Sequence, residues 1–211
     1  RAILESNVCN PYGSKPEYGE EVGKRLFSIL GIQYGDMENL RSVGIEKLLP
    51  AYRQAAFSRL FYDTYPPFVD GDVLPIHPYE AIKRGEAKNI ELMAGTNENE
   101  GALFSLLDPN IDRIDETEIR KRIRYFRGNT GESDTVVDEI YQVCTSDIGP
   151  APFNTLRYAW EQFNTDFFFR VPVQRYLDAQ SKHQSQVFSY LFAWKNPELE
   201  AKLGAMHAAE I

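Results

Sequence analysis

One stretch constrains the fold more than any other: Ile90 to Phe104 reads I-E-L-M-A-G-T-N-E-N-E-G-A-L-F. It opens with apolar residues and changes at Gly95 to a polar, turn-prone run, which places Glu98 and Glu100 before a second glycine. This pattern predicts a short buried strand that ends at Gly95 and delivers a carboxylate to its carboxyl end. In parallel α/β sheets the functional loops converge at that end. We therefore expect Glu100 to be a functional residue.

The rest of the chain alternates between strand and helix patterns. Strands are expected over 2–4 and 186–194, and helices over 17–30, 36–42, 45–57, 78–84, 115–127, 132–143 and 152–180, the last with a kink at Pro172. The aromatic and proline-rich segment 58–75 is expected to be irregular, because proline cannot donate to a strand ladder. Alternation of this kind favours an α/β fold with a parallel sheet, and the helix-rich residues 105–181 could form a layer over the edge of that sheet.

Composition and charge argue against a nucleic-acid-binding protein and against a membrane-spanning one. The chain has 211 residues, of which 43% are hydrophobic, and carries a net charge of -8. These values fit a globular domain with a sizeable core. They disfavour a nucleic-acid-binding surface, which needs clustered Lys and Arg. No stretch approaches the roughly 20 apolar residues of a membrane span, so we expect no transmembrane segment.

The two cysteines, Cys9 and Cys144, show no metal-ligand spacing, and nothing in that spacing pairs them. We expect two free thiols rather than a disulfide. No pair of histidines has metal-ligand spacing either. His77 and His183 are interpreted as structural.

Four segments resemble the type B carboxylesterase and cholinesterase family, and they follow one another along this chain in the same order as in the family. G-T-N-E-N-E-G resembles the family's acid-bearing loop, and Phe68–Pro75 resembles its acyl-side segment. Arg1–Ser6 resembles the strand after its nucleophile elbow, and Gly204–Ile211 resembles its histidine loop. The resemblance implies an α/β-hydrolase fold, present only in part: residues 1–211 would be a partial domain with a helical insertion at about 105–181. It also implies an internal to C-terminal piece of a chain more than twice as long.

The resemblance assigns two catalytic roles, in the chain order acid then histidine that the fold uses. Glu100 would orient the base and stabilise the imidazolium, and His207 would be the general base. From the residues alone, a surface histidine or one with its hydrogen bonds satisfied is the interpretation that the spacing of His207 favours. Glu98 rivals Glu100, because residues two apart in an extended chain face the same way.

The nucleophile is missing. Neither the G-x-S-x-G elbow nor a glycine run for an oxyanion hole occurs in these residues. We therefore expect this polypeptide alone to be inactive. Ser6 lacks flanking glycines. The resemblance makes it a buried serine that hydrogen-bonds near the acid, and an ordinary loop serine is the alternative.

The expected substrate is a small-molecule ester, and no cofactor is implied. Four side chains match family positions near the substrate, and core packing is the alternative for each: Leu103, Phe104, Phe61 and Tyr62. The same machinery could cleave a thioester or lactone. A second class of function is a catalytically inactive cholinesterase-like domain used for binding or adhesion. The partial sheet is also expected to expose edges and apolar faces that favour self-association.

Overall fold

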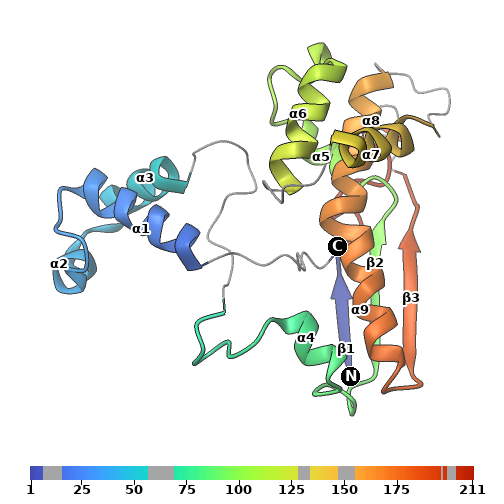
Figure 1. Ribbon diagram of the computed structural model, residues 1–211, viewed down its shortest axis with the longest axis horizontal. Coiled ribbons are helices and arrows are strands. Elements are labelled where there is room, and N and C mark those ends of the chain that lie inside the picture. The colour runs from blue at the N-terminus through green and yellow to red at the C-terminus, as the bar shows by residue number, and fades with distance from the viewer. Residues whose placement is uncertain (7–15, 57–68, 128–133, 147–154, 196, 199–202) are drawn as a thin grey trace. The chain divides into compact units, whose positions relative to one another are not determined.

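The computed structural model describes residues 1–6, 16–56, 69–127, 134–146, 155–195, 197–198 and 203–211 (Figure 1). The chain divides into two compact units, Pro11–Ala81 and a larger one that combines Arg1–Asn10 with Ile82–Ile211. In chain order the elements are β1 Ala2–Glu5, α1 Pro16–Leu30, α2 Met37–Ser42, α3 Ile45–Ala56, α4 Pro78–Lys83, β2 Leu92–Asn97, α5 Glu100–Ser105, a 3-10 turn Ile111–Arg113, α6 Glu116–Arg127, α7 Asp134–Ser146, α8 Thr155–Asn164, a π-helical turn Thr165–Arg170, α9 Val171–Ser181 and β3 Val187–Phe192.

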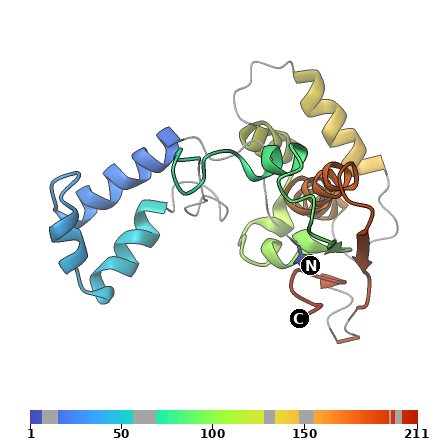
Figure 2. The ribbon, with the colours of Figure 1, turned by 90° about the horizontal axis from the view of Figure 1, so that it is seen from below.

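A parallel sheet organises the larger unit, as the alternating pattern predicts. The strands pair in the order β1-β2-β3, with Ala2 opposite Leu92 and Leu92 opposite Val187. Helix α9 lies on one face of the sheet (Figure 2). There Val173 and Leu177 pack on the apolar side chains of the strands. The register therefore follows from which strand residues this helix buries.

The opposite face of the sheet carries exposed apolar side chains. Ile3, Met93 and Phe188 are aligned across the three strands by the pairing register. Their exposed fractions are 60%, 38% and 59%. Aligned apolar side chains of this size usually mark an interaction surface. Self-association through this face and through the sheet edges stays a prediction.

Gly95 corrects the first prediction, because β2 does not end there but continues to Asn97. A Cβ at Gly95 would lie 2.3 Å from the Tyr190 carbonyl oxygen and 2.4 Å from its ring. The glycine therefore permits a close approach between β2 and β3 rather than a turn. The acid-bearing loop consequently begins two residues later than the sequence pattern indicates.

The helices after α5 form a second core. Ile119 and Ile123 of α6 are fully buried against α7 and α8. Phe126 is at the centre of an aromatic group that includes Trp160 and Phe163. Residues 105–181 are thus largely helical where they are described, and their status as an insertion within one partial domain stays a prediction.

The long helix expected over 152–180 is interrupted. Residues 152–154 lie outside the described residues, and α8 is separated from α9 by the π-helical turn Thr165–Arg170. The Val171 N–H donates to the Asp166 carbonyl, five residues back. Pro172 follows in the first turn of α9, where a missing N–H is tolerated. The irregularity expected at the proline therefore occurs as a wider turn directly before it.

Within the smaller unit, α1 packs against α3 through buried apolar residues, among them Val22, Phe27 and Ala55. Gly31, at φ +68°, follows the last residue of α1. Asp36 begins α2 by accepting a hydrogen bond from the Asn39 N–H at 3.1 Å. The predicted boundaries of α1, α2 and α4 are correct to within one residue. Helix α3 was expected to end at Phe57, which lies outside the described residues.

Cys144 is a free, buried thiol on α7. Burial raises the pKa of this thiol to about 12. A protonated, buried thiol is unreactive, and Cys144 is free, as expected. Cys9 lies outside the described residues.

Replacing Gly95 by alanine tests the close approach of β2 and β3. The added Cβ meets a backbone carbonyl that cannot rotate away, so we expect destabilisation of about 1–3 kcal/mol. Both tryptophans, Trp160 and Trp194, lie in the larger unit, so urea unfolding followed by tryptophan fluorescence reports on it. Gly23→Ala, on α1 with room for a Cβ, is the control and should leave this transition unchanged. An unaltered midpoint for Gly95→Ala would contradict the interpretation.

Candidate active site

Glu100 is the first residue of α5 and lies just beyond the end of β2. Its side chain is completely buried, with 0% exposed. The glycine that follows explains why a helix can start at this depth. The Gly101 N–H donates to Thr165 Oγ1 at 2.9 Å, and a Cβ at Gly101 would lie 2.2 Å from the Glu161 carbonyl oxygen. Helix α5 therefore packs directly on α8 and holds the carboxylate inside the fold.

Glu100 and His207 are in direct contact. His207 Nδ1 lies 2.7 Å from Glu100 Oε2, and 29% of the imidazole side chain is exposed. Because a carboxylate only accepts, Nδ1 must carry the hydrogen in this bond. Nε2 is then the basic nitrogen of the neutral ring, which is the arrangement that a general base requires.

The second oxygen of Glu100 has its own donors. Ser6 Oγ donates to Glu100 Oε1 at 2.5 Å, and the Asn97 N–H donates to the same oxygen at 2.6 Å. Ser6 is buried and adopts a left-handed φ of +51° at the end of β1. The structure thus places Ser6 beside the acid, as the resemblance implies. A strained residue that contacts a buried charge is typical of a functional site.

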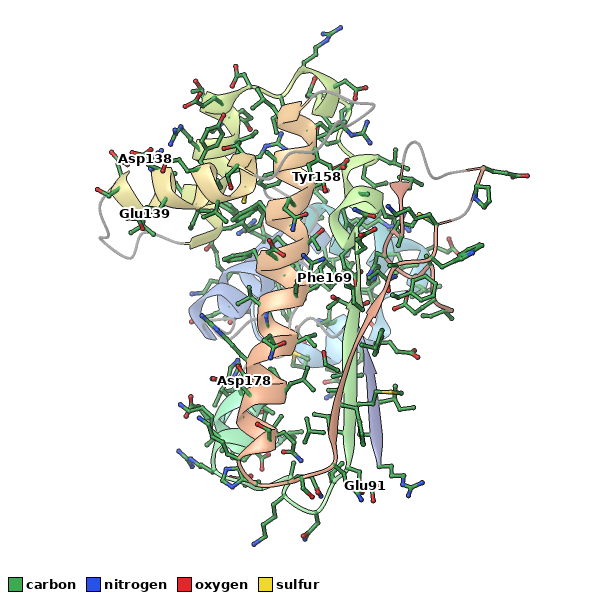
Figure 3. The ribbon with its side chains drawn as sticks, turned by 90° about the vertical axis from the view of Figure 1, so that its right-hand side faces the viewer. Glu91, Asp138, Glu139, Tyr158, Phe169 and Asp178 are labelled. Carbon is green, nitrogen blue, oxygen red and sulfur yellow. The ribbon has the colours of Figure 1, made fainter. Side chains whose placement is uncertain are left out.

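Two phenylalanine rings flank the imidazole. The ring centroids of Phe104 and Phe169 lie 5.2 and 5.0 Å from that of His207. Figure 3 shows Phe169 on the long helical run, on the side that faces the strands. Phe169 is buried, and it also contacts the histidine. Together the rings limit how far the imidazole can turn.

The remaining predicted pocket residues are only partly described. Leu103 is half-buried on α5. Phe61 and Tyr62 lie outside the described residues. The structure therefore brings together Ser6, Glu100, Phe104 and His207 from the predicted set.

Glu98 has different partners from Glu100. Its carboxylate pairs with Lys195 at 3.0 Å, and its carbonyl accepts from Arg170 Nη2 at 3.0 Å. The two glutamates do not face the same way because the chain leaves β2 at Asn97 and enters α5 at Glu100. The assumption of an extended chain through both residues was therefore wrong.

The other histidines bond to nearby backbone. His77 Nδ1 accepts from the Tyr79 N–H at 3.1 Å, and His183 Nε2 lies 2.9 Å from the Lys83 carbonyl oxygen. Both arrangements fit the structural role expected for them. In the part of the chain that is described, no cluster of three His, Cys, Asp or Glu side chains could hold a metal ion. No helix there is long and apolar enough to cross a bilayer.

Sequence reasoning missed two residues beside the acid. Glu210 Oε1 lies 3.1 Å from Ser6 Oγ, and Glu210 Oε2 accepts from Asn97 Nδ2 at 2.5 Å. Asn97 and Glu210 occur within the runs that carry the resemblance, three residues before the acid and three after the histidine. That symmetrical spacing is the one signal that could have pointed to them.

Tyr190 of β3 borders the same group of carboxylates. Burial raises the pKa of its phenol to about 12, and the negative charges of Glu210, Glu5 and Glu100 add to the shift. Among the described residues its buried hydroxyl has no hydrogen-bond partner.

A parallel sheet with α9 on one face, an acid directly after a strand and a histidine in a later loop define the α/β-hydrolase class, here in part. The sequence profile of the carboxylesterase family matches residues 1–211. This chain belongs to the carboxylesterase family.

Individual relatives agree with this assignment. The para-nitrobenzyl esterase of Bacillus subtilis is 28% identical over 214 residues, which cover 100% of this chain and 40% of that protein. The cholinesterase of Mus musculus is 25% identical over 229 residues, covering 100% of this chain and 37% of that protein. The crystal structure of a carboxylesterase from Geobacillus stearothermophilus superposes with a TM-score of 0.77 at 29% identity, over 97% of this chain and 40% of that one. The chain thus spans about 40% of the length of the first two bacterial relatives.

The Tyr190 phenol predicts how stability depends on pH. Its folded-state pKa of about 12 exceeds the value near 10 of an unfolded chain. The unfolded state therefore loses its proton first, and stability falls as the pH rises from about 10 through 12. Tyr190→Phe should lose less stability over this window. It should be no less stable at pH 7, because the hydroxyl it removes has no hydrogen bond to any described residue.

Urea unfolding at pH 7, 10 and 11, followed by far-ultraviolet circular dichroism, measures the difference. Tyr34→Phe, at a half-exposed tyrosine of the smaller unit, is the matched control. Parallel stability curves for Tyr190→Phe and the unsubstituted protein would refute the assignment.

Proposed function

We propose that this chain contributes the acid and the base of a serine carboxylesterase whose nucleophile and oxyanion hole come from polypeptide outside these 211 residues. The observation that carries the proposal is the 2.7 Å contact between His207 Nδ1 and the buried Glu100, within a chain that matches the carboxylesterase family along its whole length. The substrate would be a small-molecule carboxylic ester.

The chemistry follows from the geometry of the pair. His207 Nε2 accepts the proton of the serine hydroxyl as it attacks the ester carbonyl, and then returns it to the leaving alcohol. Glu100 holds the tautomer in which Nδ1 is protonated and stabilises the imidazolium. Water then hydrolyses the acyl-enzyme with the same base. Ser6 supports the role of Glu100 through its 2.5 Å hydrogen bond.

Substrate contacts belong to the proposal as well. Phe104 lies beside His207, so a substrate at Nε2 would meet its ring. Leu103 is proposed to lie on the acyl or alcohol side of the substrate. The substrate-binding role expected for Phe61 and Tyr62, which lie outside the described residues, stays a prediction. Apolar side chains of this kind would bind the hydrocarbon part of an ester.

The test is hydrolysis of p-nitrophenyl acetate and butyrate by the protein expressed from its complete reading frame. Glu100→Gln and His207→Ala should each lower kcat by about 10³-fold or more, because the pair acts as a unit with the nucleophile. The 211-residue chain alone should be silent.

Glu98→Gln and His183→Ala are the controls, and both variants should retain activity. Glu98 pairs with Lys195, and His183 lies beside the Lys83 carbonyl, so neither belongs to the proposed catalytic pair. An inert complete protein would favour the non-catalytic binding domain. Full activity of a folded His207→Ala variant would require a different base.

A further inference from the structure

The loop that carries His207 is attached to the chain just after β2 by two asparagines. Asn99 and Met206 form a parallel bridge, in which the Asn99 N–H donates to the Ala205 carbonyl at 2.9 Å. Asn97 Nδ2 donates to the Met206 carbonyl at 2.6 Å. These bonds hold the two residues that immediately precede His207 in the chain.

Asn97 bonds both to Glu100 and to the loop that carries His207. Its N–H donates to Glu100 Oε1, and its side-chain amide donates to the Met206 carbonyl and to Glu210 Oε2. Both side-chain partners are acceptors, so the amide nitrogen must face them. Asn97 is completely buried, and an aspartate of the same shape would place an acceptor against two acceptors.

Asn99 bonds to the same loop with the opposite polarity. Its Oδ1 accepts from the Ala205 N–H at 3.1 Å. Here the partner is a donor, so an aspartate would keep the bond. A Cβ at Gly204 would lie 2.1 Å from Asn99 Oδ1. The loop backbone therefore runs directly against this side chain, and a larger apolar side chain would push it away.

We propose that Asn97 and Asn99 are positioning residues that hold the His207 loop at the distance from Glu100 that the Nδ1 hydrogen bond requires. The Asn97 side chain donates to the Met206 carbonyl, and the Asn99 side chain accepts from the Ala205 N–H. The loop is therefore held at two consecutive residues. The consequence for ester hydrolysis rests on the proposed function, whereas the consequence for the geometry of the pair does not.

The opposite polarities give a matched test, in which one type of substitution has opposite expected results. Asn97→Asp and Asn99→Asp are made in the protein expressed from its complete reading frame, together with Asn99→Leu. The first readout is the low-field proton resonance of His207 Nδ1–H, identified by its loss in His207→Gln.

We expect Asn97→Asp and Asn99→Leu to shift or broaden this resonance beyond detection, and Asn99→Asp to preserve it. In the esterase assay the first two should lower kcat by about 10²-fold with little change in KM, because a displacement near 1 Å of a catalytic group costs about that much. Asn99→Asp should stay close to the unsubstituted protein, and Glu98→Gln controls for a neighbouring change of charge.

If Asn97→Asp does not fold, the comparison of Asn99→Leu with Asn99→Asp decides alone. An unchanged resonance in folded Asn99→Leu, or its loss in Asn99→Asp, would overturn the proposal. If the complete protein proves inert toward esters, the proposed function fails, and the resonance still decides whether the asparagines position His207.

Discussion

A fully buried carboxylate determines how this part of the chain is arranged. Removing Glu100 from water is costly unless donors replace the lost hydration. Those donors come from three places that are distant in the chain: Ser6 after β1, the N–H of Asn97 in β2, and His207 in a late loop. The β1–β2 register places Glu5 beside Gly95, and the Ser6 N–H donates to the Gly95 carbonyl at 3.0 Å. A shift of that register would withdraw the serine from the acid, so pairing and site are coupled.

Close backbone approaches make this convergence feasible. Gly95, Gly101 and Gly204 each lie where an added Cβ would come within 2.4 Å of a neighbouring heavy atom. Gly95 lets β3 pack closely against β2, and Gly101 lets α8 pack closely against α5. Gly204 lets the histidine loop pack closely against Asn99. Glycine in a strand usually weakens it, so its use at Gly95 indicates that closeness of the layers matters more here than local strand propensity.

The sequence predicted the elements better than it predicted the contacts. Hydrophobic periodicity located the strands and most helices, because burial against one face is a local pattern. It could not separate Glu98 from Glu100, because the chain turns from strand to helix between them. It also gave no sign that Gly95 permits a close approach instead of ending a strand.

Contacts across long separations were beyond such reasoning. Asn97 bonds to Met206 and Glu210 over separations of 109 and 113 residues, and no periodicity within either segment encodes that pairing. Only the family resemblance, which supplied His207 as the partner of Glu100, spans such a distance. The sequence pattern places Asn97 and Asn99 in a polar, turn-prone run, because asparagine by itself favours turns.

The chemical character of the donors explains why this pair suits proton transfer. Within the described residues, the groups that bond to Glu100 are a hydroxyl, a backbone amide and an imidazole. The first two are neutral at every stage of a reaction, so they hold the carboxylate in place without cancelling its charge. Only His207 can become a cation. When it takes a proton, the hydrogen bond from a neutral ring to an anion becomes a hydrogen-bonded ion pair, which adds the attraction between two opposite charges. The strongest interaction of the pair therefore forms only with the imidazolium, as the role proposed for His207 requires.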